Sequence, residues 1–409
     1  MRESRIKLLV LYASYTDRLS YYDDWLDALV SAPQFDAVAI NIVPRAAGFA
    51  VRQALHNVDA VVLLHSTNGD TTEYLEPIID ILAARKVPLL SFVGNEVSLP
   101  GSPIAAKRAA FAKFKPEFVA TQLLAESGRY LFGDVVTRDV VAIPHALNPK
   151  AFSPRVQDAE RDIDIGARAV RYLPHLGDDT RNSFLDVFKV EGPKRGLRVD
   201  ISDARFARDE WAAFLNRCKA TVSTEAGTWF LERDDATVNA IRAYVLDQTR
   251  GGIVIPNDSK LRRLGHKLPW WARALARKAL RAGPVRHESL VNESVPAQEI
   301  LTRFFAGRAR PQIHGKCVSS RHFDAIGTKT CQIMVRGRFN DILEADRHYI
   351  AVDESLRDLD QAIEHFRDPA FRRKITNDAY AHVMAGHTYA HRAQTVYGVL
   401  AATNITHLN

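Results

Sequence analysis

Short apolar runs alternate with segments of helical spacing throughout the first third of the chain. The apolar runs have the length of buried strands and cover residues 8–12, 37–42, 60–64, 88–93, 118–121 and 140–143. Helical spacing fills much of the sequence between them, at residues 22–30, 74–84 and 104–115. Near-continuous apolar strands that alternate with helices are typical of a parallel sheet covered on both faces. The pattern therefore predicts an α/β domain over residues 1–145.

A second series of strands and helices follows a proline-rich break. Pro144, Pro149 and Pro154 flank a short polar turn, which is typical of a linker, so residues 146–161 are expected to be a hinge. Strands are expected at residues 162–166, 197–201, 220–223 and 331–335, and helices at residues 182–190, 211–218, 359–366, 371–384 and 390–400. These elements predict a second α/β domain over residues 162–385 and a C-terminal helix within residues 386–409.

Composition narrows the class of protein. The chain has 409 residues, 46% of them hydrophobic, which suits a globular protein of two domains. The apolar run near the N-terminus is too short to span a membrane and lacks a good cleavage site after it, so we expect a strand. The three cysteines, Cys218, Cys317 and Cys331, are too scattered for a disulfide framework or a zinc site. We therefore expect a cytoplasmic protein that holds no metal.

Several polar residues directly follow predicted strands. In open parallel sheets, ligands bind beyond the carboxyl ends of the strands. His65 is the sharpest candidate, since an imidazole there can act as a general base or bind a sugar hydroxyl; alternatively, it only caps its strand. The carboxylates of Asp17, Asp70, Glu96 and Glu225 occupy similar positions, although loops are rich in acidic residues in any case.

A short helix is predicted after Ser319 or Ser320, either of which is a good N-cap. The free N–H groups of a helix N-terminus attract phosphate, and Arg321 in the first turn can add further donors. Asp324, one turn later, can accept hydrogen bonds from ribose hydroxyls. The competing interpretation is a capped core helix with an arginine and an aspartate at its surface. Elsewhere in this domain, Arg168 and Arg181 are further candidates for phosphate contacts, as is Arg171.

Residues 259–287 form a basic insertion that contains no acidic residue. From Pro269 onwards the pattern predicts an amphipathic helix, with a basic stripe opposite an apolar side. Its expected membrane contacts are Trp270, Trp271, Arg273, Arg277 and Arg281. A basic helix with paired tryptophans suits an anionic membrane surface. The alternatives are a solvated arm or a helix packed on its own protein. Nucleic acid is disfavoured because the tryptophans do not alternate with the basic residues.

Four stretches resemble the GT-B glycosyltransferases, in particular glycosyltransferase family 1 and its CgeB-like group. They are residues 224–227, 319–330, 337–350 and 387–392, which total 36 residues and lie almost wholly in the second domain. The resemblance implies two Rossmann-like domains whose parallel sheets face a central cleft. It also implies that the C-terminal helix crosses back to the first domain.

The resemblance also implies roles for individual residues. A nucleotide-sugar donor is expected in the second domain, with Asp324 at the ribose and with Ser320 and Arg321 at the diphosphate. His65 resembles the histidine that many GT-B enzymes place beside the reacting sugar. Two departures matter: Asp324 stands where the family usually has glutamate, and Lys316 stands where a broader motif has an acidic residue. Glu225 is expected to take over that acidic role, and the stereochemical outcome stays open.

The predicted function is metal-independent transfer of a sugar from a nucleotide-sugar donor to a saccharide or lipid-linked acceptor, with no other cofactor. Asp70 and Glu96 are expected on the acceptor side. The product is expected to be a surface polysaccharide or glycolipid, made in the cytoplasm or at the inner face of the cell membrane. Two alternatives keep the fold: a nucleotide-sugar epimerase or hydrolase, and a non-catalytic module that binds nucleotide-sugars.

Overall fold

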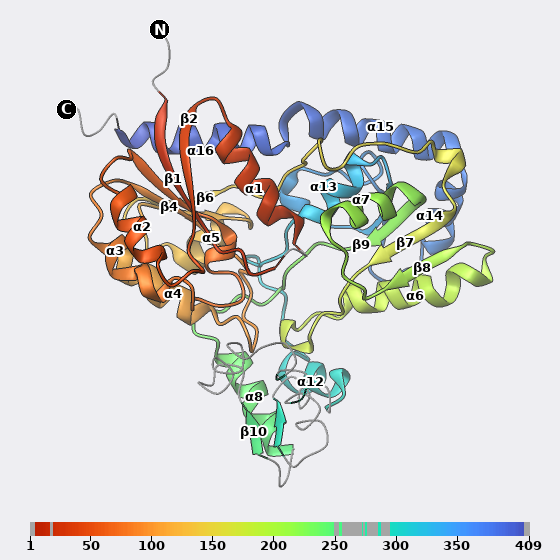
Figure 1. Cartoon of the computed structure of the whole chain (residues 1–409). Coiled ribbons are helices and arrows are strands. Elements are labelled where there is room, and N and C mark those ends of the chain that lie inside the picture. Colours follow the sequence, from red (N-terminus) through yellow and green to blue (C-terminus); the bar gives the residue numbers. More distant parts are fainter. Residues whose placement is uncertain are drawn as a thin grey trace.

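Two parallel β-sheets, each covered by helices, organise the molecule (Figure 1). The computed structural model describes residues 5–16, 19–248, 253–255, 285–287 and 295–404, together with Ala272 and Leu275. Helices and strands alternate along the chain within each half, which is the connectivity that a parallel sheet requires. The predicted fold class of two parallel α/β domains is confirmed.

The N-terminal sheet has six strands in the order β2-β1-β3-β4-β5-β6. The strands are β1 (Ile6–Tyr12), β2 (Phe35–Asn41), β3 (Ala60–Leu63), β4 (Leu89–Phe92), β5 (Phe118–Thr121) and β6 (Asp139–Ala142). Each agrees with a predicted apolar run to within two residues at either end. The helices are α1 (Ser20–Ser31), α2 (Ala47–Ala54), α3 (Ile79–Ala83), α4 (Ile104–Phe114) and α5 (Ala125–Phe132).

The sequence pattern did not predict α2 and α5, and both helices contain a glycine. Gly128 in α5 is required by packing, because a Cβ atom there would lie 2.5 Å from the Cγ2 atom of Thr121 on β5. This close approach lets α5 lie on the sheet beside β5 and β6. A glycine within a helix lowers the helical propensity of the segment, so the local sequence did not predict α5. The packing that requires Gly128 is seen only in the folded structure.

The C-terminal sheet has five strands in the order β13-β12-β9-β7-β8. They are β7 (Ile163–Arg168), β8 (Val199–Ser202), β9 (Cys218–Ser223), β12 (Cys331–Val335) and β13 (Ile350–Val352). The surrounding helices are α6 (Thr180–Lys194), α7 (Arg208–Arg217), α13 (Ser320–Gly327), α14 (Leu359–Arg367) and α15 (Pro369–Gly386). The three cysteines lie in or beside this domain, and all are buried and unpaired.

The C-terminal helix α16 (Tyr389–Asn404) joins the two halves (Figure 1). After α15 has passed along the C-terminal domain, α16 packs on the N-terminal sheet through Tyr389, Val396 and Leu400, in the same core cluster as Trp25 and Phe35. The chain therefore ends on the domain in which it began.

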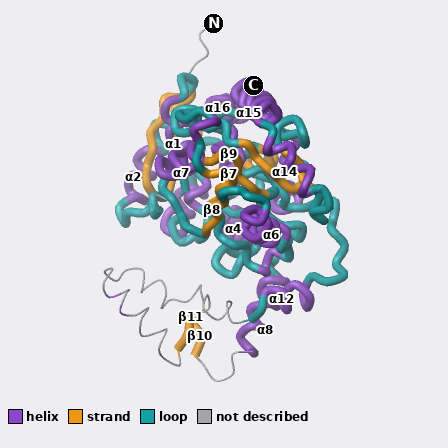
Figure 2. The backbone as a smooth tube through the Cα atoms, turned by 90° about the vertical axis from the view of Figure 1, so that its right-hand side faces the viewer, coloured by secondary structure: helices purple, strands orange, loops and turns teal. Residues whose placement is uncertain are grey.

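A small subdomain lies apart from the two sheets, at the bottom of the views in Figures 1 and 2. It contains α8 (Ala236–Gln248), α12 (Ala297–Phe304) and the paired strands β10 (Ile253–Ile255) and β11 (Val285–His287). Asp235, just before α8, accepts hydrogen bonds of 3.0 and 2.9 Å from the backbone N–H groups of Ile104 and Ala105, at the start of α4. The subdomain is therefore attached to the N-terminal domain as well.

The predicted membrane-contact residues of the insertion lie outside the described residues. These are Trp270, Trp271, Arg273, Arg277 and Arg281. Within the described part of the chain, we find no helix with the length and apolar character that crossing a bilayer would need.

Candidate functional site

The carboxyl ends of the two sheets face each other across a cleft made of three adjoining pockets. The central pocket has a volume of about 380 Å³ and is lined from the N-terminal domain by Tyr21, Asp70 and Glu96, and from the C-terminal domain by Tyr172 and Ala226, among others. A second pocket, of about 210 Å³, shares Tyr172 with it. A third, of about 50 Å³, shares Tyr21 with the central pocket. The three pockets therefore adjoin one another and lie where ligands bind in open α/β sheets.

Helix α13 reaches this cleft with its N-terminal tip, as the sequence predicted. Ser319 is the N-cap, and its backbone N–H donates a hydrogen bond of 3.0 Å to Nδ1 of His322. Because Nδ1 accepts that bond, Nε2 carries the proton and donates it to the carbonyl of Thr224, 3.2 Å away. Burial lowers the pKa of His322 to about 3, so the ring stays neutral. His322 thus fixes the helix tip against the end of β9.

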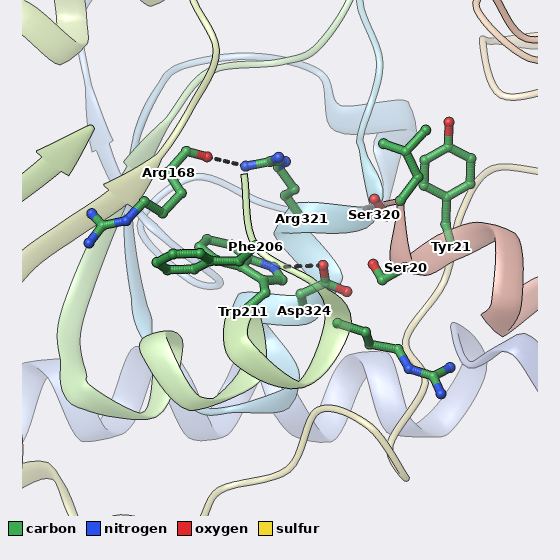
Figure 3. Close-up of a pocket in the computed structure, with 10 residues that line it drawn as sticks. Ser20, Tyr21, Arg168, Phe206, Trp211, Ser320, Arg321 and Asp324 are labelled. Atoms are coloured by element: carbon green, nitrogen blue, oxygen red, sulfur yellow. Dashed lines mark hydrogen bonds between the residues drawn. The ribbon is translucent and has the colours of Figure 1, made fainter. Parts of the chain in front are cut away.

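Asp324 lies one turn into α13 and lines the third pocket, which we call the small pocket (Figure 3). Its Oδ2 atom accepts a hydrogen bond of 3.0 Å from the indole N–H of Trp211. The carboxyl group is 2% exposed, and burial raises its pKa well above the usual value; nearby Asp24 adds to the rise. Its place beside the cleft suits a contact with a polar ligand group.

Arg321 separates the small pocket from the second pocket and lines both. It donates a hydrogen bond to the backbone carbonyl of Arg168, and its guanidinium lies 5.4 Å from the ring of Trp211 (Figure 3). Burial lowers the pKa of Arg321 to about 10, and the neighbouring Arg181 contributes to the lowering. A cation held here against like charge has much to gain from an anionic ligand.

The second pocket, which we call the arginine pocket, is lined by Arg171, Arg181, Arg205 and Arg321. Arg171 pairs with Asp186 at 2.8 Å, and Arg181 stacks over Tyr172 at 4.4 Å. Within the described residues, neither Arg181 nor Arg205 forms an ion pair with a carboxylate. Several arginines without enough acidic partners make a site for phosphate groups.

The sequence analysis missed Arg205, although a usable signal existed. Arg205 follows the end of β8 by three residues, so the rule that ligands bind beyond strand ends would have selected it. Arg168 was a predicted phosphate contact, but both of its terminal nitrogens bind the carboxylate of Asp200 at 2.8 Å. Its guanidinium also lies over the ring of Phe214, at 3.9 Å. Arg168 therefore supports Arg321 through its carbonyl, while its own charge is already neutralised.

His65 lies behind the wall of the cleft. It is 1% exposed and is surrounded by the rings of Tyr21, Trp25, Phe92 and His145. Neither ring nitrogen has a hydrogen-bond partner among the described residues. Burial lowers the pKa of His65 well below its usual value, so the ring is neutral.

The two predicted acceptor-side carboxylates do line the central pocket. Asp70 accepts a hydrogen bond of 2.6 Å from the side-chain amide of Asn95. Glu96 accepts one bond from the hydroxyl of Thr121 and another, of 2.8 Å, from the backbone N–H of Gln122. Burial raises the pKa of Glu96 to about 7. The third predicted acid at this rim, Asp17, lies outside the described residues.

Glu225 is buried beside the central pocket and holds the loop that follows β12. Its Oε1 atom accepts a hydrogen bond of 2.6 Å from the backbone N–H of Phe339, and burial raises its pKa. A Cβ atom at Gly337 would lie 2.5 Å from Oε2, so the loop needs glycine to approach this closely. Lys316, at the position where an acid was expected, forms a buried ion pair with Asp178. The carboxylate of Glu225 is thus committed in part to loop structure.

Residues 260–398 match a family described as "Glycosyl transferase-like". The chain carries a glycosyl transferase-like domain. No curated protein matches the sequence.

Two solved structures of Anabaena Alr3699/HepE resemble the whole chain. The complex of HepE with UDP-glucose has a TM-score of 0.54 at 10% identity, and covers 97% of this chain and 100% of that one. The complex with UDP has a TM-score of 0.50 at 9% identity, with the same coverage. At this identity the likeness concerns the fold. Together with the glycosyl transferase-like domain, it confirms the predicted GT-B glycosyltransferase; the CgeB-like subgroup stays a prediction.

Proposed function

We propose that the protein transfers a sugar from a nucleotide-sugar donor to a saccharide or lipid-linked acceptor bound in the cleft. The observation that carries this proposal is the arginine pocket, which adjoins Asp324 at the tip of α13. A nucleoside diphosphate has the matching chemistry, with an anionic diphosphate next to ribose hydroxyls. The similarity of the fold to HepE, solved with UDP-glucose and with UDP, supports the same assignment.

The main requirement of the proposed reaction is to stabilise the negative charge on the departing nucleoside diphosphate. As the bond between the sugar's anomeric carbon and the phosphate oxygen breaks, its electron pair stays on the diphosphate, while the acceptor oxygen bonds to that carbon and gives up its hydroxyl proton to a neighbouring base or to solvent. Arg321, Arg181 and Arg205 would stabilise the negative charge that develops. No step in this scheme requires a metal ion. Within the described residues, no three side chains of His, Cys, Asp or Glu are grouped as metal ligands, and the metal-independent reaction stays a proposal.

The acceptor would bind in the central pocket. Asp70, Asn95 and Glu96 lie on its N-terminal side and offer hydrogen-bond partners for sugar hydroxyls. Val170, Leu173 and Leu176 on the opposite side offer apolar contacts. Closure of the two domains around both substrates would exclude water and favour transfer over hydrolysis.

The test has two stages. A thermal-shift screen of UDP, GDP, ADP and CDP first identifies the nucleotide, since a ligand at 100 times its Kd adds about 2.7 kcal/mol to the free energy of unfolding. The matching nucleotide-sugars are then incubated with saccharide and lipid-linked acceptors, with and without a chelator, and the released nucleoside diphosphate is measured. We expect release that depends on an acceptor and persists in the chelator.

Two other outcomes would favour the alternative functions. Donor turnover without an acceptor would indicate a hydrolase or an epimerase. Nucleotide binding without any turnover would indicate a non-catalytic module, an outcome for which the burial of His65 is the specific argument.

We also propose that the basic insertion contacts an anionic membrane surface. The support is the sequence alone, because residues 259–287 contain nine lysine and arginine residues and no acidic residue, with two adjacent tryptophans. The described subdomain from which the insertion extends lies below the two domains in the view of Figure 1. A lipid-linked acceptor would then reach the central pocket from the membrane side, in the synthesis of a surface polysaccharide or glycolipid.

A further inference from the structure

Tyr21 is the side chain that lies between His65 and the cleft. Its ring meets the ring of His65 edge-on, with centroids 5.9 Å apart, and packs against His145 at 4.5 Å. On its other side, Tyr21 lines both the small pocket and the central pocket. It also lies close enough to Arg321 to feel that residue's charge. Figure 3 shows Tyr21 at the start of α1, next to Ser20 and on the same side of the pocket as Ser320.

Two polar neighbours of His65 bond to each other. The indole N–H of Trp25 donates a hydrogen bond of 3.2 Å to Nδ1 of His145, so neither of these two atoms is left to pair with His65. Phe92 stacks on His65 at 4.6 Å and offers no polar atom. A neutral imidazole has one donor and one acceptor, and in His65 both are buried without a partner in the described chain. Such a group costs free energy and calls for an explanation.

We propose that Tyr21 is a movable cover over His65, and that substrate binding turns Tyr21 aside so that a ring nitrogen of His65 meets a substrate hydroxyl. This inference rests on the proposed sugar transfer for the identity of the substrate. In the uncovered state the unpaired nitrogen gains the partner that it lacks in the structure. In the covered state Tyr21 keeps water away from the imidazole. Tyr21 is thus a positioning residue, which acts on the reaction through His65.

The cover can be tested without any substrate, by chemical labelling. Diethyl pyrocarbonate modifies an accessible neutral imidazole, and peptide mass spectrometry locates the modified histidine. We expect the labelling rate of His65 to rise on the order of tenfold in Tyr21→Ala, because removal of the ring opens a path from the cleft. Tyr21→Phe should leave His65 protected, since the ring remains.

Tyr22→Ala is the matched control, because Tyr22 packs edge-on against Tyr21, with ring centroids 4.7 Å apart, and bonds to Tyr15 at 2.8 Å, so this variant removes a neighbouring ring and leaves the ring of Tyr21 in place. His65 should remain protected in this variant. Equal labelling of His65 in wild type and Tyr21→Ala, or equal gains in the Tyr21 and Tyr22 variants, would overturn the proposal.

Kinetics then test the role of the covered group. In Tyr21→Ala we expect acceptor-independent hydrolysis of the donor to increase relative to transfer, with the wild-type ratio kept in Tyr21→Phe. His65→Phe keeps an aromatic ring in the cage and removes two unpaired polar atoms, so it should fold well. We expect it to lower kcat by about 10² to 10³, the range of a lost general base, with the donor KM little changed.

A stable His65→Phe variant with wild-type kcat would show that His65 is only a packing residue, and the inference would fall. The proposed function fails separately, if wild type releases no nucleoside diphosphate from any donor. In that case the labelling experiment still decides whether Tyr21 covers His65.

Discussion

Trp211 donates its indole N–H to the carboxyl group of Asp324 over 3.0 Å, at the floor of the small pocket (Figure 3). The two residues come from α7 and α13, so this bond ties the helix tip to its neighbour. It also orients the carboxyl group, leaving its other oxygen for a ligand. If a ribose binds there, both residues contribute to donor affinity, but Asp324 contributes more.

We therefore predict that Asp324→Ala weakens the binding of a nucleoside diphosphate by about 1–3 kcal/mol, the cost of leaving ligand hydroxyls unpaired. Trp211→Phe should weaken it less, because the carboxyl group remains but is less well held. Titration calorimetry measures both. Asp209→Ala, at an exposed position on α7, is the control and should bind as wild type does. Equal affinity in Asp324→Ala and in the control would remove Asp324 from the donor site.

The arginine pocket leads to a second prediction. Arg181→Ala and Arg205→Ala should each lower the affinity for a nucleoside diphosphate by about tenfold, the effect of losing one charge-assisted hydrogen bond. Affinity for the unphosphorylated nucleoside should not change, since these side chains are expected to contact phosphate only.

Arg195 provides the control for the arginine variants. It is at the far end of α6 and pairs with Glu191 and Asp360, so Arg195→Ala should bind both ligands normally. A loss of nucleoside affinity in the pocket variants equal to their loss of diphosphate affinity would mean that they had disturbed the fold.

Most of the fold was predictable from the sequence, because the strands of a buried parallel sheet consist of nearly continuous apolar residues. The end of each such run also located the cleft, and Asp70 and Glu96 are indeed on its wall. The sequence did not predict which residue each side chain at a strand end would contact in the folded protein. Arg168 meets Asp200 only because β7 pairs with β8 in a register that brings Arg168 opposite Ser202.

His65 is a second residue whose contacts the sequence did not predict. Its position after β3 predicted the rim of the cleft, and His65 does begin the short 3₁₀ turn, His65–Thr67, that follows this strand. Whether the side chain faces the cleft depends on α1, whose first turn carries Tyr21 over it. The packing of a helix against a distant loop has no local signature in the sequence, so covering of this kind was not predictable.

A third prediction concerns the pH dependence of stability. Burial raises the pKa of Glu96 from 4.5 to about 7, so the folded state holds the proton more tightly than the unfolded chain does. The resulting stabilisation is present in full below pH 4.5 and is lost as the pH rises through 7. In Glu96→Gln, which carries no titrating group, this loss should be absent.

Urea unfolding of both proteins between pH 5 and 8.5 measures the effect of Glu96. We expect the wild type to lose up to about 3 kcal/mol relative to Glu96→Gln across this range, since each pKa unit corresponds to about 1.36 kcal/mol. Glutamine can keep both hydrogen bonds, to Thr121 and to Gln122, so the variant should fold. If the free energies of unfolding of wild type and Glu96→Gln change with pH in the same way, Glu96 titrates at its ordinary pKa.

The last prediction concerns the basic insertion. Replacing Arg273, Arg277 and Arg281 by glutamate should abolish sedimentation with anionic vesicles, because each basic residue near such a surface contributes about 1 kcal/mol and each reversal also adds repulsion. Neutral vesicles should retain neither protein. The matched control reverses the exposed residues Lys189, Lys194 and Arg357 of the C-terminal domain, which changes the net charge equally. If this control releases the protein as completely, net charge governs the binding and the insertion has no special part in it. If wild type does not sediment at all, the membrane contact itself is wrong, while the donor-site predictions stand on their own measurements.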